Sequence, residues 1–454
     1  MLTVKIKSSC SVKPSEPTPD VKLFLSEWDH IKIYTHTPLL YIYPSDQVTS
    51  SSVSNPVETL KASLNRLLVS YYPLAGRLNC IEGGRFELHC NAVGVEMVEA
   101  ETDSVIEDLG DFRPSLETKK LIPPFKCGGI CVVIALSHIV VDGKGALGFI
   151  SSWANFARGG NELSVKPFHD RTVFYRGDPL AKPRFDHTEF KASPSLLLGQ
   201  EDPTEERMKE STVTMMKLSK TQVETLKKKA NEGRSKDDTS REFSRFEAIA
   251  GHIWRCVSKA RKLRTEQLTS LRIIADCRSR FRPPLPDGYY GNVIMVTRPV
   301  AEVGELLSGL GAACRKISEG LARLNDDYVK SATDFLVSQK DLTPFRSSDV
   351  TTGLFLGNPN LVITSWSGLP IYDADFGWGE PIFMGPAAVG VEGRSYIIPG
   401  RHEQGSFIIL VRLQVAYIAD FEKFFYERGT GSEKSLIDPV EKKCKNDFFC
   451  KSNL

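Results

Sequence analysis

The sequence lacks a run of about 18 consecutive apolar residues, the length that a membrane-spanning helix requires. Its first 20 residues contain three prolines and no apolar core, which is unlike a secretory signal. We therefore expect a cytoplasmic protein that has no membrane partner.

The ten cysteines include no Cys-x-x-Cys pair, so the spacing indicates neither a zinc ribbon nor a thioredoxin-like motif. His89 and Cys90 are adjacent but cannot build a tetrahedral site by themselves. Without a secretory signal, the thiols are expected to be reduced and mostly buried. No bound metal is expected.

The sequence has no large excess of acidic or of basic residues. The 58 basic and 56 acidic residues give a formal net charge of +2, which argues against a nucleic-acid partner because phosphate binding needs a basic face. The 454 residues, 41% of them hydrophobic, are enough for two or three domains with substantial cores. Nothing in the sequence indicates an oligomer, so a monomer is expected.

Strand and helix patterns alternate along the whole chain, which predicts an α/β protein with mixed sheets. Residues 31–43 indicate a strand broken by Pro38, and residues 130–137 (ICVVIALS) indicate a buried strand. A helical stripe covers residues 57–70. Capping boxes at Ser219/Gln222 and Ser244/Glu247 predict two helix starts. Three further elements are predicted: a helix near 304–324 and strands near 361–366 and 406–415.

The strongest chemical feature is His138, which directly follows the strand 130–137 and precedes Asp142 and Gly143. The end of a buried strand is where α/β folds expose reactive side chains. Histidine has the unperturbed pKa best suited to taking a proton at neutral pH. Gly143 is expected to permit a turn that a Cβ would obstruct. By itself the pattern is more typical of a core histidine beside a solvated aspartate.

Three motifs occur together in this chain: YYPLAGRL at 71–78, SHIVVDG at 137–143 and DFGWG at 375–379. In this order and at these separations they resemble the BAHD acyltransferases, and the resemblance covers nearly the whole chain. Residues 276–292 and 363–379 are similar to the shikimate hydroxycinnamoyl transferases. Further blocks, among them 84–101 and 251–261, are similar to the spermidine hydroxycinnamoyl transferases and are longer and less generic.

The resemblance implies a two-domain, chloramphenicol-acetyltransferase-like fold with a solvent channel between the domains. We expect an N-terminal domain over 1–185, a crossover linker over 186–215 and a C-terminal domain over 216–428. Residues 429–454 are polar and without periodicity, and are expected to form a mobile tail.

The same resemblance implies the chemistry. A hydroxycinnamoyl-CoA thioester would be the co-substrate, with no bound cofactor. His138 would be the general base in direct acyl transfer, and Trp366 would donate to the developing oxyanion. Asp142 would be structural and would pair with Arg278.

Other residues receive roles by the same resemblance. The acyl and acceptor pocket would contain His36, Thr37, Tyr41, Tyr372 and Asp373. Contacts to the CoA phosphates would come from Ser244, Arg245 and Arg280. A structural loop would be formed by Asp375, Gly377, Trp378 and Gly379. For several of these, ordinary packing or solvated surface charge explains the sequence equally well.

The residue at position 368 bears on the identity of the acceptor. The shikimate subgroup binds its acceptor's carboxylate with an arginine there, and this chain has Gly368, which cannot supply a bidentate pair. Spermidine is therefore the favoured acceptor, with Asp327, Asp334 and Asp373 as candidate amine contacts. The alternatives are O-acylation of shikimate, quinate or another alcohol, and a catalytically impaired relative that binds acyl-CoA.

The impaired alternative rests on a departure from the family pattern. Relatives carry an extra apolar strand just before the FKCGG block, whereas in this chain KKLIPP (119–124) runs directly into Phe125. A missing strand in the domain of His138 would leave part of the sheet and channel uncovered.

Overall fold

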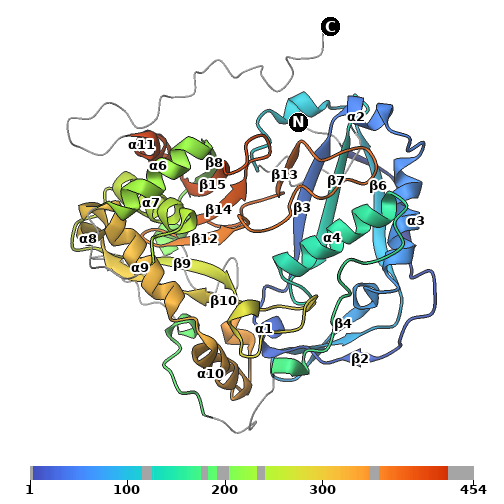
Figure 1. The fold of residues 1–454 in the computed structure, drawn as a ribbon, viewed down its shortest axis with the longest axis horizontal. Helices are drawn as coiled ribbons and strands as arrows, with labels where there is room; N and C mark the ends of the chain where they lie inside the picture. The colour runs from blue at the N-terminus through green and yellow to red at the C-terminus, as the bar shows by residue number, and fades with distance from the viewer. Residues whose placement is uncertain are drawn as a thin grey trace.

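The computed structural model describes residues 4–114, 125, 127–174, 182–191, 204–232, 241–346 and 357–427. The predicted tail over 429–454 and the junction at 119–124 lie outside these residues. Two halves lie side by side in Figure 1, the N-terminal half in blue to cyan and the C-terminal half in green to red. The predicted domain limits near 185 and 215 stay a prediction.

Three small sheets belong mainly to the N-terminal half: β1–β6, β2–β5–β4 and β13–β3–β7. One of their strands, β13, comes from far along the chain and pairs with β3 in an antiparallel register that places Met384 opposite Tyr41. This pairing anchors a C-terminal segment in the first half of the molecule. The strands are β1 Val4–Val12, β2 Lys22–Leu23, β3 His36–Tyr43, β4 Arg77–Ile81, β5 Arg85–His89, β6 Val95–Thr102, β7 Ile130–Ser137 and β13 Phe383–Pro386.

The C-terminal half is built on a seven-stranded mixed sheet in the order β10–β9–β12–β14–β15–β8, with β11 also paired to β9. Alternate residues such as Ile363 and Ile409 pack under the helices of this half, whereas Tyr396 and Leu410 join the core that contains β3 and β7. One face of the sheet is therefore covered by helices and the other faces the N-terminal half. The strands are β8 Ser211–Leu218, β9 Leu268–Asp276, β10 Ile294–Thr297, β11 Val300–Glu302, β12 Leu361–Ser365, β14 Arg394–Pro399 and β15 Phe407–Gln414.

The helices cover these sheets from outside, with α3 and α4 packed together in the N-terminal half and α6, α7, α9 and α11 grouped in the C-terminal half (Figure 1). They are α1 Glu27–His30, α2 Ser45–Ser50, α3 Pro56–Leu67, α4 Gly143–Ala157, α5 Thr204–Met208, α6 Lys220–Asn231, α7 Arg245–Ala260, α8 Val303–Ser308, α9 Leu310–Ala322, α10 Asp326–Val337 and α11 Val415–Tyr426.

Most local predictions are confirmed. The strand over 130–137 is β7, and the Ser219 and Ser244 capping boxes are the N-caps of α6 and α7. Two predictions are wrong. Gly309 divides the helix expected over 304–324 into α8 and α9. Pro38 does not break β3, because it lies within the ladder opposite Ala135 and its carbonyl accepts a hydrogen bond from the amide of Ala387.

Candidate active site

His138 follows the last residue of β7, and its main chain is held from two sides. Its amide donates to the carbonyl of Thr35 at 3.2 Å, and its carbonyl accepts from Nδ2 of Asn292 at 2.8 Å. The ring atom Nδ1 is buried without a hydrogen-bond partner, whereas Nε2 is neither buried in this way nor bonded to a described residue. The backbone is fixed, and Nε2 is the ring nitrogen that solvent can reach.

The surroundings of His138 keep its imidazole neutral. Burial first, and then the nearby charge of Lys32, lower the pKa of His138 below its usual value, while Asp142 and Asn292 act in the opposite direction. A neutral imidazole is the form that accepts a proton.

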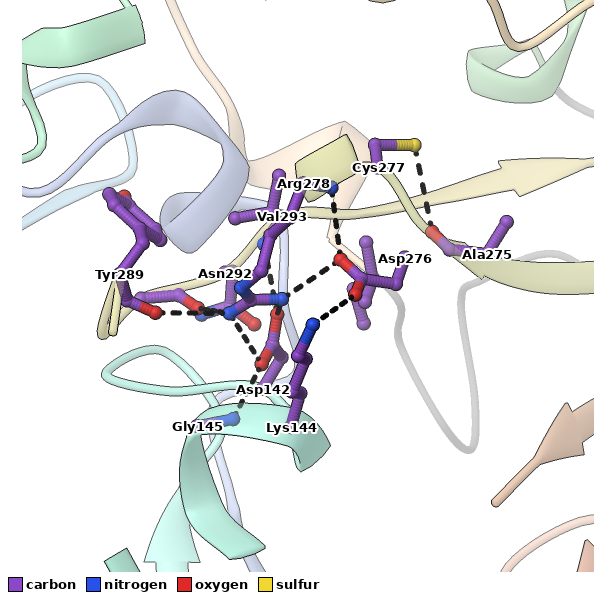
Figure 2. Close-up of polar contacts among 12 residues, drawn as sticks. Asp142, Lys144, Gly145, Ala275, Asp276, Cys277, Arg278, Tyr289, Asn292 and Val293 are labelled. Carbon is purple, nitrogen blue, oxygen red and sulfur yellow. Dashed lines mark hydrogen bonds and ion pairs between the residues drawn. The ribbon is translucent and has the colours of Figure 1, made fainter. Parts of the chain in front are cut away.

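Asp142 is fully occupied by structural contacts (Figure 2). Its Oδ2 accepts from Arg278 at 2.8 Å and from the amide of Val293 at 3.0 Å. Its Oδ1 accepts from the second guanidinium nitrogen of Arg278 at 2.9 Å and caps α4 through the amide of Gly145 at 3.1 Å. The carboxylate is buried, so it joins β7 and α4 to the segment after β9 and has no free lone pair directed at a reacting atom.

Arg278 is itself fixed by further acceptors. It donates to Oδ1 of Asp276 at 3.0 Å and to the carbonyl of Gly291 at 3.0 Å, and Asp276 in turn lies 3.4 Å from the ammonium of Lys144 (Figure 2). The contact between Arg278 and Asp142 that the sequence predicted is therefore present, within a wider network across the two halves.

A second set of buried polar contacts supports the loop after His138, and it is centred on Asp29, which no sequence motif singled out. Asp29 of α1 accepts at Oδ1 from the amide of Asn292 at 2.9 Å and from its Nδ2 at 2.8 Å. Arg171 donates to Oδ2 of Asp29 at 3.0 Å and to the carbonyl of Val140 at 2.9 Å, with both side chains inaccessible to solvent. Asn292 closes the block GYYGN, which is the one signal that could have singled it out.

The expected role of Gly143 needs correction. A Cβ there would meet only Cδ1 of Leu369 at 3.9 Å, which is an ordinary contact, and its backbone is not in the left-handed region. The tight approach occurs two residues later, where a Cβ on Gly145 would lie 2.5 Å from Cγ2 of Val141. The close packing at the start of α4 therefore depends on Gly145.

Trp366 directly follows β12 and is 8% exposed. Its amide donates to the carbonyl of Ile397 at 2.8 Å, and its ring packs edge-on against Tyr396 at 5.3 Å between centroids. No described residue accepts a hydrogen bond from its indole N–H. The donor is therefore available at the core that also contains Val132 and Ile134 of β7.

The predicted pocket residues of β3 divide between its two faces. Thr37 and Tyr41 share one face because side chains alternate along a strand. Both hydroxyls are buried without a partner. His36 belongs to the other face and is exposed, on a cavity of about 700 Å³ that Ser137, next to His138, also lines. Tyr372 packs against the same core as Tyr41 and donates to the carbonyl of Pro399 at 3.1 Å.

The DFGWG segment forms a tight loop around the carboxylate of Asp375. The carboxylate of Asp375 accepts from the amides of Gly377 at 2.9 Å and Gly379 at 2.8 Å. These glycines have φ of +111° and +91°, a backbone region that side chains with a Cβ disfavour. Trp378 is buried edge-on against Tyr43 at 5.7 Å.

The three residues expected at the CoA phosphates have protein partners. Ser244 caps α7 and donates to Glu247 at 2.7 Å. Arg245 is paired with Glu224, and Arg280 donates to the carbonyls of Leu321 at 2.9 Å and Leu324 at 2.8 Å.

The three acids expected to contact a polyamine do not form one cluster of unpaired carboxylates among the described residues. Asp327 is paired with Arg184 at 2.9 Å, and both are exposed. Asp334 lies two turns further along α10, and Asp373 is an exposed residue between β12 and β13.

Within the described ranges, no group of three or more His, Cys, Asp or Glu side chains could hold a metal ion. The described cysteines are free thiols, and most are buried. Among the described helices, none combines the length and apolar character needed to cross a membrane.

Known proteins resemble this chain over most of its length. The model of the Transferase family matches residues 2–428. A hydroxycinnamoyl-CoA:piscidic acid hydroxycinnamoyltransferase from Actaea racemosa is 58% identical over 450 residues, covering 93% of this chain and 99% of the relative. A shikimate O-hydroxycinnamoyltransferase from Nicotiana tabacum is 40% identical over 447 residues, covering 94% and 100%.

The alignment with the Actaea relative contains gaps in this chain. It spans 450 positions but covers only 93% of the 454 residues of this chain, so the relative has residues at positions where this chain has none.

Among solved structures, vinorine synthase superposes with a TM-score of 0.67 at 22% identity, covering 92% of this chain and 96% of that one. This likeness shows the two-domain α/β fold. The family uses a coenzyme A thioester as co-substrate without a metal or prosthetic group. The extensive match to hydroxycinnamoyltransferases, over nearly the whole length of both chains, establishes that the protein is an acyltransferase of the BAHD Transferase family.

Proposed function

We propose that this protein transfers a hydroxycinnamoyl group from coenzyme A to a hydroxyl group of a small carboxylic acid, with His138 as the general base. The observation that carries the proposal is the contrast between the two ring nitrogens of His138. Nδ1 is sealed from solvent, whereas Nε2 is accessible in a residue whose pKa is lowered by burial. A fixed, neutral imidazole with one reachable nitrogen suits proton abstraction.

The proposed steps use few residues. The acceptor oxygen attacks the thioester carbonyl while Nε2 of His138 takes the hydroxyl proton. The C–S bond then breaks, and the imidazolium returns the proton to the departing thiolate. The indole N–H of Trp366, which has no acceptor among the described residues, would donate to the oxyanion of the tetrahedral intermediate.

Asn292 would act as a positioning residue. Its Oδ1 is buried and unpaired, as is Nδ1 of His138, and the two residues are already joined through Nδ2 of Asn292 and the histidine carbonyl. A small adjustment would let Nδ1–H donate to Oδ1, which fixes the tautomer that leaves Nε2 free to accept a proton.

The acyl ring would lie along β3. The unpaired buried hydroxyls of Thr37 and Tyr41 face the core shared with β7, and such groups require a partner that a bound phenol can supply. Asp142 and Arg278 would hold the loop after His138 in place and would not exchange protons with the substrate.

The acceptor class is argued from two observations. The two hydroxycinnamoyltransferase relatives described above are named for the acceptors piscidic acid and shikimate, and both acceptors are carboxylic acids. The acids that a polyamine would need, Asp327, Asp334 and Asp373, are paired or dispersed. N-acylation of spermidine therefore stays a sequence-based prediction that no described contact favours.

The test is a substrate panel. Purified protein is mixed with p-coumaroyl-CoA and either piscidic acid, shikimate, quinate or spermidine, and thiol release and the acylated product are measured. Acceptor-dependent release is expected with at least one of the three acids and not with spermidine. Release with spermidine alone would refute the proposed acceptor. No release with any acceptor, from protein whose circular dichroism shows it folded, would favour the acyl-CoA-binding alternative.

A further inference from the structure

Arg272 in the middle of β9 has an unsatisfied guanidinium. Its Nη1 atom is buried without a hydrogen-bond partner, and no described residue hydrogen-bonds the rest of the group. A buried cationic donor that lacks an acceptor is costly, so native proteins seldom keep one without a ligand or ordered water.

Two more arginines lie close to Arg272. In the sheet, Val362 of β12 is the register partner of both Arg272 and Arg394, so the two arginines flank it on one face. Arg298 directly follows β10, whose last residue pairs with Ile273 of β9. We call these three residues, Arg272, Arg298 and Arg394, the arginine row.

The arginine row belongs to the face of the sheet that looks toward the N-terminal half. The neighbours of Val362 in β12, Leu361 and Ile363, pack in the core under the helices. Side chains alternate along a strand, so Val362 and its register partners point the opposite way. Trp366 joins the core that contains β7 and lies four residues beyond Val362, about 13 Å along a strand.

The positive charge of Arg272 has no hydrogen-bonded carboxylate among the described residues. Burial first, and then the charge of Arg298, lower the pKa of Arg272 to about 10, and Arg394 adds to this shift. Glu189 is the carboxylate that opposes the shift. Its Oε1 bonds Nδ1 of His187 at 2.9 Å and its Oε2 accepts from Tyr328 at 2.7 Å, and no hydrogen bond joins it to Arg272 among the described residues.

We propose that the arginine row is an anion subsite that binds an oxyanion of a substrate through the free guanidinium of Arg272. This inference rests on the proposed function and assigns a site that the motifs do not contain. The oxyanion is either the carboxylate of the acceptor or a phosphate of coenzyme A. Arginine suits both, because its planar donors match carboxylate and phosphate oxygens. At position 368, where the shikimate subgroup carries an arginine for the acceptor's carboxylate, this chain has glycine, and the row would supply the missing cation.

The test compares Arg272→Gln, Arg272→Lys and Arg394→Gln with wild type. Arg264→Gln is the matched control, since this exposed arginine pairs with the equally exposed Glu266 at 3.4 Å. KM is measured for the acid acceptor and its methyl ester, and for p-coumaroyl-CoA and p-coumaroyl-pantetheine, which lacks the phosphates. Circular dichroism and the thermal midpoint establish that each variant is folded.

For an acceptor carboxylate, Arg272→Gln should raise KM for the acid about 10-fold to 100-fold and leave that for the methyl ester unchanged, because a charge-assisted hydrogen bond is lost. For a phosphate, the same rise should affect p-coumaroyl-CoA and not the pantetheine thioester. Arg272→Lys should recover part of the loss in either case.

Unchanged KM values for all four substrates in folded Arg272→Gln would overturn the subsite. If wild type turns over no acceptor, the proposed function fails separately. Calorimetric titration with coenzyme A and with the free acid then decides the subsite. Binding weakened by Arg272→Gln supports the subsite, and equal or absent binding in both proteins refutes it.

Discussion

Two histidines in this molecule have opposite surroundings. His187, in the segment between the two halves, has Nδ1 on Oε1 of Glu189 at 2.9 Å and Nε2 on the hydroxyl of Ser331 at 2.9 Å, and its side chain is inaccessible. This set is the combination of a hydroxyl, an imidazole and a carboxylate that serine hydrolases use. His138 has no such partners, and one nitrogen reaches solvent.

The two histidines differ in the hydrogen-bonding capacity that their surroundings leave unused. The hydroxyl of Ser331 also accepts from the amides of Arg184 at 2.8 Å and Phe185 at 3.2 Å, and the serine is fully buried. Every polar atom of that set is occupied, so it fastens residues 182–191 to α10. At His138 the unsatisfied capacity is what a substrate can use.

The largest expected effect is at His138. His138→Ala should lower kcat about 10²-fold to 10⁴-fold, the usual contribution of a general base, without a large change in the thermal midpoint. Steady-state kinetics with p-coumaroyl-CoA measures the effect. Turnover equal to wild type would remove His138 from the mechanism.

Asp142→Asn should act on stability. The change leaves Arg278 facing a neutral amide in a buried site, and breaking a buried pair typically costs about 3–5 kcal/mol in the free energy of unfolding. Urea denaturation measures this loss. A variant with wild-type stability and only a shifted pH–rate profile would mean that Asp142 takes part in proton transfer.

His187→Ala should have the reverse profile of His138→Ala. It leaves the buried Oε1 of Glu189 without its partner and removes one of the partners of the Ser331 hydroxyl, at a cost of about 1–3 kcal/mol in the free energy of unfolding. The kcat of the folded fraction should equal that of wild type. A fall in kcat with unchanged stability would mean that the Ser331–His187–Glu189 set has a catalytic role.

Lys32→Met should produce the smallest effect, a shift in pH dependence. Burial is the main cause of the lowered pKa of His138, and the charge of Lys32 is the next. The neutral base is lost as pH falls through that lowered pKa, so wild type should keep activity below pH 6.5, the ordinary value for histidine.

Removing the Lys32 charge should raise the pKa of His138 and move the acid limb of kcat/KM to higher pH. Lys61→Met on the exposed surface of α3 is the control. An acid limb that stays in place, or moves to lower pH, would show that Lys32 does not tune the base.

The sequence identified the candidate active-site residue because its signal lies in residues that are close together along the chain. A continuous apolar run ending at His138, followed by Asp142, is visible without a fold, and the capping boxes at Ser219 and Ser244 locate helix starts because they involve residues three apart. The partnership of Asp142 with Arg278 came from family resemblance, since 136 residues separate them.

Other features were out of reach of the sequence. Asp29 and Arg171 lie 142 residues apart, and neither belongs to a recognisable motif. The arginine row is formed by three strands that meet only when the sheet assembles. Gly143 was chosen over Gly145 because the motif ends there, whereas steric need depends on which side chain approaches.

The sequence by itself determined the class of the protein and the residue that we propose as the base, because hydrophobic periodicity, caps and motifs are local along the chain. Tertiary structure alone decided which polar atoms are satisfied. It saturated His187 and Asp142 while leaving His138, Trp366 and Arg272 with unused hydrogen-bonding capacity. Burial and partner geometry set the free energy of a polar group, and both depend on segments that are distant in the sequence.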